Sequence, residues 1–242
     1  MTWVKICGIT NLEDAQLAVE AGADALGFVF YEKSPRNIQP EVAREIVSAL
    51  PERVENVGVF VESPCLQSVD IARQVGLTAL QNTLRFPLSS DSQQAIGFAG
   101  FPRPPKLFIS ISIADFLEDD DTIRGLARSF LTSRRGVPGQ AAIPDGWFDT
   151  FFLDSGTPEQ PGGTGKSFDW EKAVPVAEAM REGGLKLVVA GGLTPANVAE
   201  AMRILKPWGV DVSSGVEAKP GKKDPEQVRA FINAVREADK NA

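Results

Sequence analysis

The chain has 242 residues and a formal net charge of −7 at pH 7. This length suits one α/β barrel, so we expect a single domain over residues 1–242, and the acidic balance disfavours nucleic acid and anionic membranes as partners. Two cysteines and no histidine exclude a disulfide framework, a Ser–His–Asp triad and His-ligated metal sites.

The first half of the chain alternates between short β-rich runs and amphipathic helical segments. The predicted strands are Val4–Cys7, Ala25–Phe30, Val57–Val61 and Thr78–Gln81. A capping box that begins at Thr10 predicts a helix with apolar positions through Val19. Pro40 opens a second predicted helix, and Cys65–Val75 is a third.

The same alternation continues in the second half, with a less regular middle. The predicted strands are Leu107–Ile113, Trp147–Leu153, Leu185–Ala190 and Val210–Ser213. The predicted helices are Asp91–Phe98, Asp119–Leu131, Phe168–Met180 with an interruption at Pro175, one capped by Thr194-Pro195, and one capped by Asp224-Pro225. Residues 132–146 are rich in Gly and Pro and are predicted to be a loop.

Eight strand–helix units predict parallel strands closed into a (β/α)8 TIM barrel, with an irregular or enlarged region around the fourth and fifth units, at residues 82–146. No G-x-G-x-x-G follows the first strand, which disfavours a dinucleotide-binding fold. Side chains alternate along a strand, so Lys5 and Cys7 share one face while Val4 and Ile6 share the other. We expect the polar set to point into the barrel, where active sites form at the carboxyl ends of the strands.

Two residues at predicted strand ends are candidates for acid–base chemistry. Cys7 ends the first strand and is either a small buried hydrophobe or a thiolate base, which the charge of Lys5 on the same face would favour. Asp154 ends the sixth strand and is either a turn residue or a general acid whose pKa apolar surroundings raise. Cys65, at a predicted helix start, is interpreted as structural.

Backbone amides at two further strand ends predict a phosphate site. Gly191 and Gly192 follow the seventh strand, and Ser213, Ser214 and Gly215 follow the eighth. These two loops are neighbours in a barrel, where their N–H groups and a nearby helix start bind phosphate.

Other charged residues are either solvated loop charges or ligand-binding groups. Arg36 follows the second strand and is either a solvated loop charge or a fork that binds a substrate carboxylate. We expect Lys219, Lys222 and Lys223 to lie in a solvated loop. The Gly-rich run Gly162–Lys166 lacks the spacing of a nucleotide-binding loop and is interpreted as a βα loop.

Six motifs in order along the chain carry a family resemblance. They are Val4–Thr10, Gly27–Phe30 with Ser34–Arg36, Leu153–Ser155, Gly162–Trp170, Ala190–Leu193 and Val210–Glu217. Together they resemble the phosphoribosylanthranilate isomerases of tryptophan biosynthesis, over the whole chain except residues 82–146.

The resemblance implies an Amadori rearrangement. N-(5-phosphoribosyl)anthranilate would become 1-(2-carboxyphenylamino)-1-deoxyribulose 5-phosphate, with no metal or redox cofactor because hydrogen moves within one molecule. By the same resemblance, Cys7 is the general base, Asp154 is the general acid, and Arg36 meets the anthranilate carboxylate.

The resemblance also assigns substrate-binding positions. The matching residues are Gln81, Asp211, Gly191, Gly192, Ser213, Ser214 and Gly215, with Asp211 expected to hold sugar hydroxyls and the last five the phosphate. The chain departs from the family where Gln-Leu-His-Gly usually follows the fourth strand, since Gln81 is followed by Asn82 and Thr83. Ser110 and Ser112 stand where the fifth strand usually carries Lys-Ala.

The expected partner is a small phosphorylated substrate, with no nucleic acid or membrane. We expect a cytoplasmic monomer, with a weak homodimer as the alternative, because the N-terminus lacks a secretory pattern and no exposed apolar stripe stands out. Two other functions stay open: a related phosphosugar isomerase or lyase, and a catalytically silent barrel that binds a phosphorylated metabolite. A panel of phosphosugar substrates would distinguish the related enzyme from a phosphoribosylanthranilate isomerase. Substrate binding without turnover would favour the silent barrel.

Overall fold

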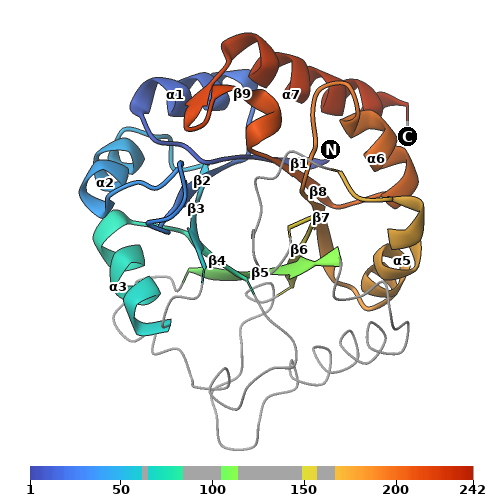
Figure 1. Cartoon of the computed structure of the whole chain (residues 1–242), viewed down its shortest axis with the longest axis horizontal. Coiled ribbons are helices and arrows are strands. Elements are labelled where there is room, and N and C mark those ends of the chain that lie inside the picture. Colours follow the sequence, from blue (N-terminus) through green and yellow to red (C-terminus); the bar gives the residue numbers. More distant parts are fainter. Residues whose placement is uncertain (62–64, 84–104, 114–148, 157–166, 242) are drawn as a thin grey trace, which may run out of the picture.

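A computed structural model describes residues 1–61, 65–83, 105–113, 149–156 and 167–241. Parallel strands close into a barrel in chain order from β1 to β8, with helices around the ring (Figure 1). The strands are β1 (Trp3–Cys7), β2 (Ala25–Val29), β3 (Glu55–Phe60), β4 (Ala79–Thr83), β5 (Lys106–Ser112), β6 (Thr150–Asp154), β7 (Lys186–Val189) and β8 (Gly209–Val212). The predicted (β/α)8 barrel is confirmed.

The outer layer and one small hairpin complete the described elements. The helices are α1 (Leu12–Ala21), α2 (Pro40–Ser48), α3 (Cys65–Val75), α5 (Val174–Glu182), α6 (Val198–Leu205) and α7 (Pro225–Lys240), with 3-10 turns η3 (Glu171–Ala173) and η4 (Ser214–Val216). After β8, β9 (Glu217–Lys219) pairs antiparallel with β10 (Lys222–Lys223). The predicted helices Asp91–Phe98 and Asp119–Leu131, the loop 132–146, and Gly162–Lys166 lie outside the described residues.

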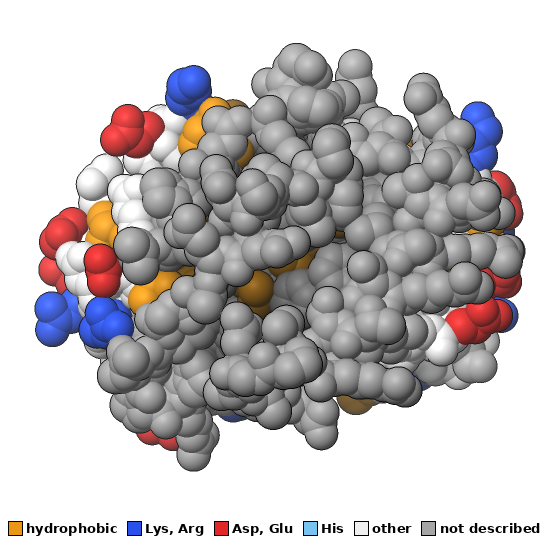
Figure 2. Space-filling view, turned by 90° about the horizontal axis from the view of Figure 1, so that it is seen from below, with side chains coloured by type: hydrophobic (Ala, Val, Ile, Leu, Met, Phe, Trp, Pro, Cys, Tyr) orange, Lys and Arg blue, Asp and Glu red, His pale blue; other side chains and the backbone are white. Residues whose placement is uncertain are grey.

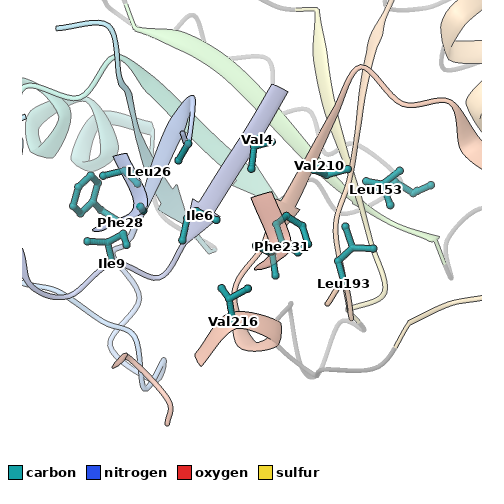
Figure 3. Packing of buried hydrophobic residues seen from close by; sticks show 14 of the residues in the cluster. Val4, Ile6, Ile9, Leu26, Phe28, Leu153, Leu193, Val210, Val216 and Phe231 are labelled. Carbon is teal, nitrogen blue, oxygen red and sulfur yellow. The ribbon is translucent and has the colours of Figure 1, made fainter. Parts of the chain in front are cut away.

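Two apolar layers result from the alternation along each strand. The outward set, which includes Val4 and Ile6, packs beneath the helices, and Figure 3 shows Phe231 of α7 among side chains from β1 and β8. The inward apolar set is Ala25, Val57, Ala79, Phe108, Phe152 and Val188, packed against Trp3. Burial of both layers supplies the main stabilisation of the barrel. The inner layer closes the amino-terminal end, so polar inward residues meet at the carboxyl ends.

Three helix starts differ from the sequence-based predictions. Asn11, rather than Thr10, caps α1 by accepting from Asp14 N, because the Thr10 hydroxyl donates to Gly221 O instead. Pro175 lies in the first turn of α5 and begins that helix rather than interrupting it, since the first turn needs no N–H donor there. A turn closed by Asn197 delays α6 to Val198.

Charged groups of both signs occupy the molecular surface. Figure 2 shows Asp, Glu, Lys and Arg side chains at the margins of one face. Within the described residues, no helix combines the length and the apolar character needed to cross a membrane.

Candidate active site

A buried ion pair lies directly above the inner apolar layer. Lys5 on β1 and Asp211 on β8 are register partners, and Lys5 Nζ donates to Asp211 Oδ1 at 3.0 Å. Lys5 is fully buried, and its ammonium lies 5.1 Å from the centroid of the Phe152 ring. The prediction that the polar face of β1 points into the barrel is therefore confirmed.

The Cys7 side chain follows Lys5 on the same inward face at the end of β1. Its register partner is Gly27 of β2, where an added Cβ would lie 2.7 Å from Cys7 Sγ and 3.0 Å from Lys5 Cε. Burial raises the pKa of the Cys7 thiol, while the charges of Lys5 and Lys223 lower it, and the net pKa stays above its usual range. The thiol is buried, with 8% of the residue exposed.

Asp154 ends β6, where its register partner is Ser112 of β5. Gly156 N donates to Asp154 Oδ1 at 2.8 Å, and the Ser112 hydroxyl donates to Gly156 O at 2.6 Å, so the turn after β6 is held from two sides. Burial raises the pKa of the Asp154 carboxyl, and the charge of Asp211 adds to this rise. A carboxyl in this setting keeps its proton to higher pH, as a general acid requires.

Cys7 and Asp154 come from strands on different sides of the ring, yet they share neighbours. The charges of Lys5 and Asp211 act on the titration of both groups. Strand alternation gives the same direction: Cys7 follows the inward Lys5 by two residues, and Asp154 follows the inward Phe152 by two residues. Lys5 Nζ lies 5.1 Å from the Phe152 ring, so the two inward faces meet below Cys7 and Asp154. The convergence of this thiol and this carboxyl on one substrate stays a prediction.

The Arg36 guanidinium forms two hydrogen bonds with a carboxylate of the chain itself. Arg36 Nε and Nη2 donate to Glu217 Oε1 and Oε2 at 2.9 and 2.8 Å. Lys223 Nζ donates to the same Glu217 Oε1 at 2.9 Å and to Ser213 O at 3.1 Å. Burial raises the pKa of Glu217, but Arg36 and Lys223 lower it more, so the carboxylate stays ionised.

The expectation that Lys223 lies in a solvated loop is wrong. Only 1% of Lys223 is exposed, because alternation along β10 turns it inward while Lys222 faces outward to Glu13 and Asp14. Sequence reasoning missed this residue and the role of Glu217. The available signal was the position of Lys223 directly before the helix cap Asp224, which leaves little room for a free loop.

The two loops of the predicted phosphate site lie against each other. Gly191 and Gly192 adopt positive φ values of 75° and 67°, which few other residues tolerate. A Cβ on Gly215 would collide with the Leu193 carbonyl, so only glycine permits the η4 turn to approach the loop after β7. The backbone of both loops is thereby brought to one place at the carboxyl ends of β7 and β8.

Gln81 of β4 contributes a buried amide to the interior. Its Nε2 donates to Ser110 Oγ at 2.7 Å, and within the described part of the chain its Oε1 has no hydrogen-bond partner. A buried acceptor without a partner costs free energy, which a bound hydroxyl would recover. In the same described part, no group of three or more His, Cys, Asp or Glu side chains could hold a metal ion.

A closed (β/α)8 barrel with polar inward groups and paired glycine loops at the carboxyl ends of its strands has the layout of a barrel enzyme. The family profile described as N-(5'phosphoribosyl)anthranilate (PRA) isomerase matches residues 4–82 and 140–234. A curated relative, the N-(5'-phosphoribosyl)anthranilate isomerase of Geobacter sp. strain M21, is 43% identical over 232 residues, or 96% of this chain and 97% of the relative. The chain belongs to the PRA isomerase family.

Solved structures of this family agree with the fold. The crystal structure of phosphoribosyl anthranilate isomerase from Thermotoga maritima has a TM-score of 0.74 at 39% identity and covers 98% of this chain and all of its own. A second isomerase structure, in complex with reduced 1-(o-carboxyphenylamino)-1-deoxyribulose 5-phosphate, has a TM-score of 0.71 at 36% identity, with the same coverage.

The close approach at Gly27 makes a testable prediction. Gly27→Ala would place a methyl group against Cys7 Sγ and Lys5 Cε, so the thiol must shift and kcat is expected to fall about tenfold or more. Gly58→Ala on β3 is the matched control, because its Cβ would meet Leu77 and Phe60 of the outer layer instead. We expect this control to lower the melting temperature and retain kcat; an equal loss of kcat in both variants would contradict the role of Gly27.

Proposed function

We propose that the chain isomerises N-(5'-phosphoribosyl)anthranilate to 1-(o-carboxyphenylamino)-1-deoxyribulose 5-phosphate, with Cys7 as general base and Asp154 as general acid. The observation that supports this proposal is the inward direction of β1 and β6 in a chain of this family: Lys5, two residues before Cys7, lies 5.1 Å from the ring of Phe152, two residues before Asp154. A related phosphosugar reaction or a silent barrel lacks an observation that favours it.

The proposed reaction is a series of proton transfers that leaves the substrate's atoms and oxidation level unchanged overall. Asp154 donates a proton to the furanose ring oxygen, the bond from that oxygen to C1 breaks, and an iminium forms between C1 and the anthranilate nitrogen. The iminium acidifies the C2–H, whose proton the Cys7 thiolate removes to give an enolamine. Transfer of the 2-hydroxyl proton to C1 then yields the ketone, so substrate and product are isomers and no electron acceptor is needed. The Cys7 thiol loses its proton to water and the Asp154 carboxylate takes one from water, which restores the starting state of both groups.

The active state needs an ionised thiol and a protonated carboxyl. A thiol is ordinarily a much weaker acid than a carboxyl, and burial raises the pKa of both groups, so the tautomer with an ionised thiol and a protonated carboxyl is the minor one. Between the two macroscopic pKa values the fraction of this tautomer is constant. We therefore expect kcat/KM to rise with pH through the raised carboxyl pKa, level off, and fall through the raised thiol pKa.

Substrate binding is proposed to use the remaining inward groups. The glycine loops around Gly191 and Gly215 bind the phosphate through backbone N–H groups, and Gln81 and Asp211 meet sugar hydroxyls. Glu217 fixes one edge of the Arg36 guanidinium and leaves its remaining N–H donors for the anthranilate carboxylate.

Replacing Arg36 tests this carboxylate contact. Arg36→Ala is expected to raise KM by roughly 10- to 100-fold, because a charge-assisted hydrogen bond contributes about 1.5–3 kcal/mol. Arg36→Lys keeps the charge without the fork and should recover part of the loss. Steady-state kinetics decide the matter: an unchanged KM in Arg36→Ala would remove this residue from substrate binding.

Turnover of the purified chain tests the proposed function directly. Anthranilate fluorescence of the substrate is lost as the product forms, so the parent chain should show saturable decay. Expression in a tryptophan auxotroph that lacks this isomerase should restore growth, and a Cys7/Asp154 double variant should not. Substrate binding without turnover would favour the silent barrel instead.

We propose that the chain works as a monomer in the cytoplasm. The support is that Cys7, Asp154 and Arg36 all come from one chain, and that a free Cys7 thiol suits a reducing compartment. Sedimentation at assay concentration tests the monomer, with a weak homodimer as the contrary result.

A further inference from the structure

The mechanism above gives a role to Asp211 but none to Lys5, the buried cation that is paired with it. A fully buried lysine in the barrel interior costs solvation free energy, and a well-packed apolar pair would stabilise the fold as well or better. The layer directly beneath consists of apolar side chains, so the interior itself provides such a packing pattern. Stability alone therefore leaves the pair unexplained.

The pair lies against the sulfur of Cys7. Lys5 precedes Cys7 by two residues on the same face, and the Cβ that Gly27 lacks would contact both Sγ and Cε. The ammonium donates to Asp211 Oδ1 at 3.0 Å, and the charges of Lys5 and Cys7 act on each other's titration. The cation is thus paired with one carboxylate and lies beside one thiol.

We propose that Lys5 is a positioning residue that stabilises and orients the Cys7 thiolate, and that Asp211 limits this effect by holding the ammonium. This inference rests on the proposed role of Cys7 as the base. Burial lowers the pKa of Lys5, but Asp211 and Cys7 raise it above its usual value, so Lys5 remains a cation throughout the working pH range.

Other charges face Cys7 from the elements around it, and they are weaker influences. Lys223 of β10 lowers the thiol pKa less than Lys5 does, and Asp154 of β6 faces the same interior. Beyond Lys223 lie Glu217 and Arg36, paired with each other. Gly27 of β2 places no side chain beside the sulfur. Lys5 and Asp211 are therefore the groups whose removal should shift the thiol most, and in opposite directions.

Replacing Lys5 and replacing Asp211 should shift the pKa of the Cys7 thiol in opposite directions, and an absorbance titration can detect this difference. In a Cys65→Ser background, Cys7 is the one remaining thiol, and its ionisation is followed by ultraviolet thiolate absorbance against pH, corrected with the matching Cys7→Ser protein. Lys5→Met should move the thiol midpoint up by about one pH unit or more, and Asp211→Asn should move it down. Lys5→Arg should restore most of the parent midpoint. Loosened packing alone would move both variants in the same direction.

The expected effect on kcat depends on the population of the active tautomer, in which Cys7 is ionised and Asp154 is protonated. Each unit of rise in thiol pKa lowers the active fraction about tenfold, so Lys5→Met should lose kcat by roughly that factor while KM changes little. The alkaline limb of the kcat/KM profile should move with the absorbance midpoint. A purely structural role would lower the melting temperature and leave this limb in place.

A folding failure of Lys5→Met would leave the proposal testable, because Asp211→Asn keeps the lysine and the double variant Lys5→Met/Asp211→Asn buries no unpaired charge. Either an unchanged midpoint in Asp211→Asn or an upward shift there would overturn the proposal. Retained activity in Cys7→Ser would instead overturn the proposed function and leave the absorbance shifts as they are. The two failures are therefore distinguishable.

Discussion

Replacing Cys7 by Ser is expected to lower kcat by roughly 10²–10⁴-fold, the usual contribution of one positioned proton transfer. A hydroxyl is a far weaker acid than a thiol, so beside Lys5 it remains protonated and cannot accept the C2 proton. The change is nearly isosteric and leaves the Lys5–Asp211 contact in place. Steady-state fluorescence kinetics should therefore show a large fall in kcat with KM changed by only a few-fold.

The second cysteine provides the matched control. Cys65 is the first residue of α3, an outer helix, and Cys65→Ser should keep kcat close to that of the parent. Full activity in Cys7→Ser would assign the proton abstraction to another group. An equal loss in both variants would indicate damage to the fold, which circular dichroism of the two proteins can show.

Asp154→Asn is expected to lower kcat by roughly 10²–10⁴-fold, because the amide keeps the acceptor for Gly156 N and loses the proton that opens the sugar ring. The acidic limb of the kcat/KM profile, which we assign to this carboxyl, should disappear in any residual activity. Near-parent turnover would remove Asp154 from the acid role.

Asp154→Asn is expected to raise the stability of the fold although it lowers kcat. Burial raises the pKa of Asp154 above its unfolded value, so its contribution to stability is fully present below the unfolded pKa and is lost as pH rises through the folded pKa. Asp154→Asn avoids this loss and should melt at a higher temperature than the parent at neutral pH. The difference should vanish in acid.

Asp149→Asn is the control on the same strand. Asp149 lies just before β6 at its amino-terminal end, where it pairs with Lys186 at 3.0 Å. Its replacement should lower the melting temperature and leave kcat unchanged, the reverse of Asp154→Asn. Melting curves and kinetics of the two variants together separate an active-site carboxylate from a structural one.

The inward or outward direction of many side chains could be predicted from sequence, because a strand alternates with a period of two residues. That period places Lys5 and Cys7 inside and Val4 and Ile6 outside, as the structure has them. The glycine pairs were recognisable for a similar reason, since sharp turns at strand ends require residues that accept positive φ.

The contacts between distant segments could not be predicted in the same way. Lys223 appeared as one of several loop lysines, and its burial depends on Glu217 and Arg36, which the barrel brings together from far along the chain. Thr10 lost the capping role to Asn11 because its hydroxyl meets Gly221, again across the chain. A sequence pattern predicts local geometry. The partners of Lys223 and Thr10 are instead set by closure of the barrel, which brings distant segments together.

A crystal structure of this chain with reduced 1-(o-carboxyphenylamino)-1-deoxyribulose 5-phosphate tests the central claim most directly. The account predicts that Cys7 Sγ and Asp154 approach the carbon chain of one bound ligand from different sides, each within hydrogen-bonding distance. The phosphate should lie at the loops of Gly191 and Gly215, and the carboxylate at Arg36. A ligand seated in this barrel with either Cys7 or Asp154 out of reach would contradict the account.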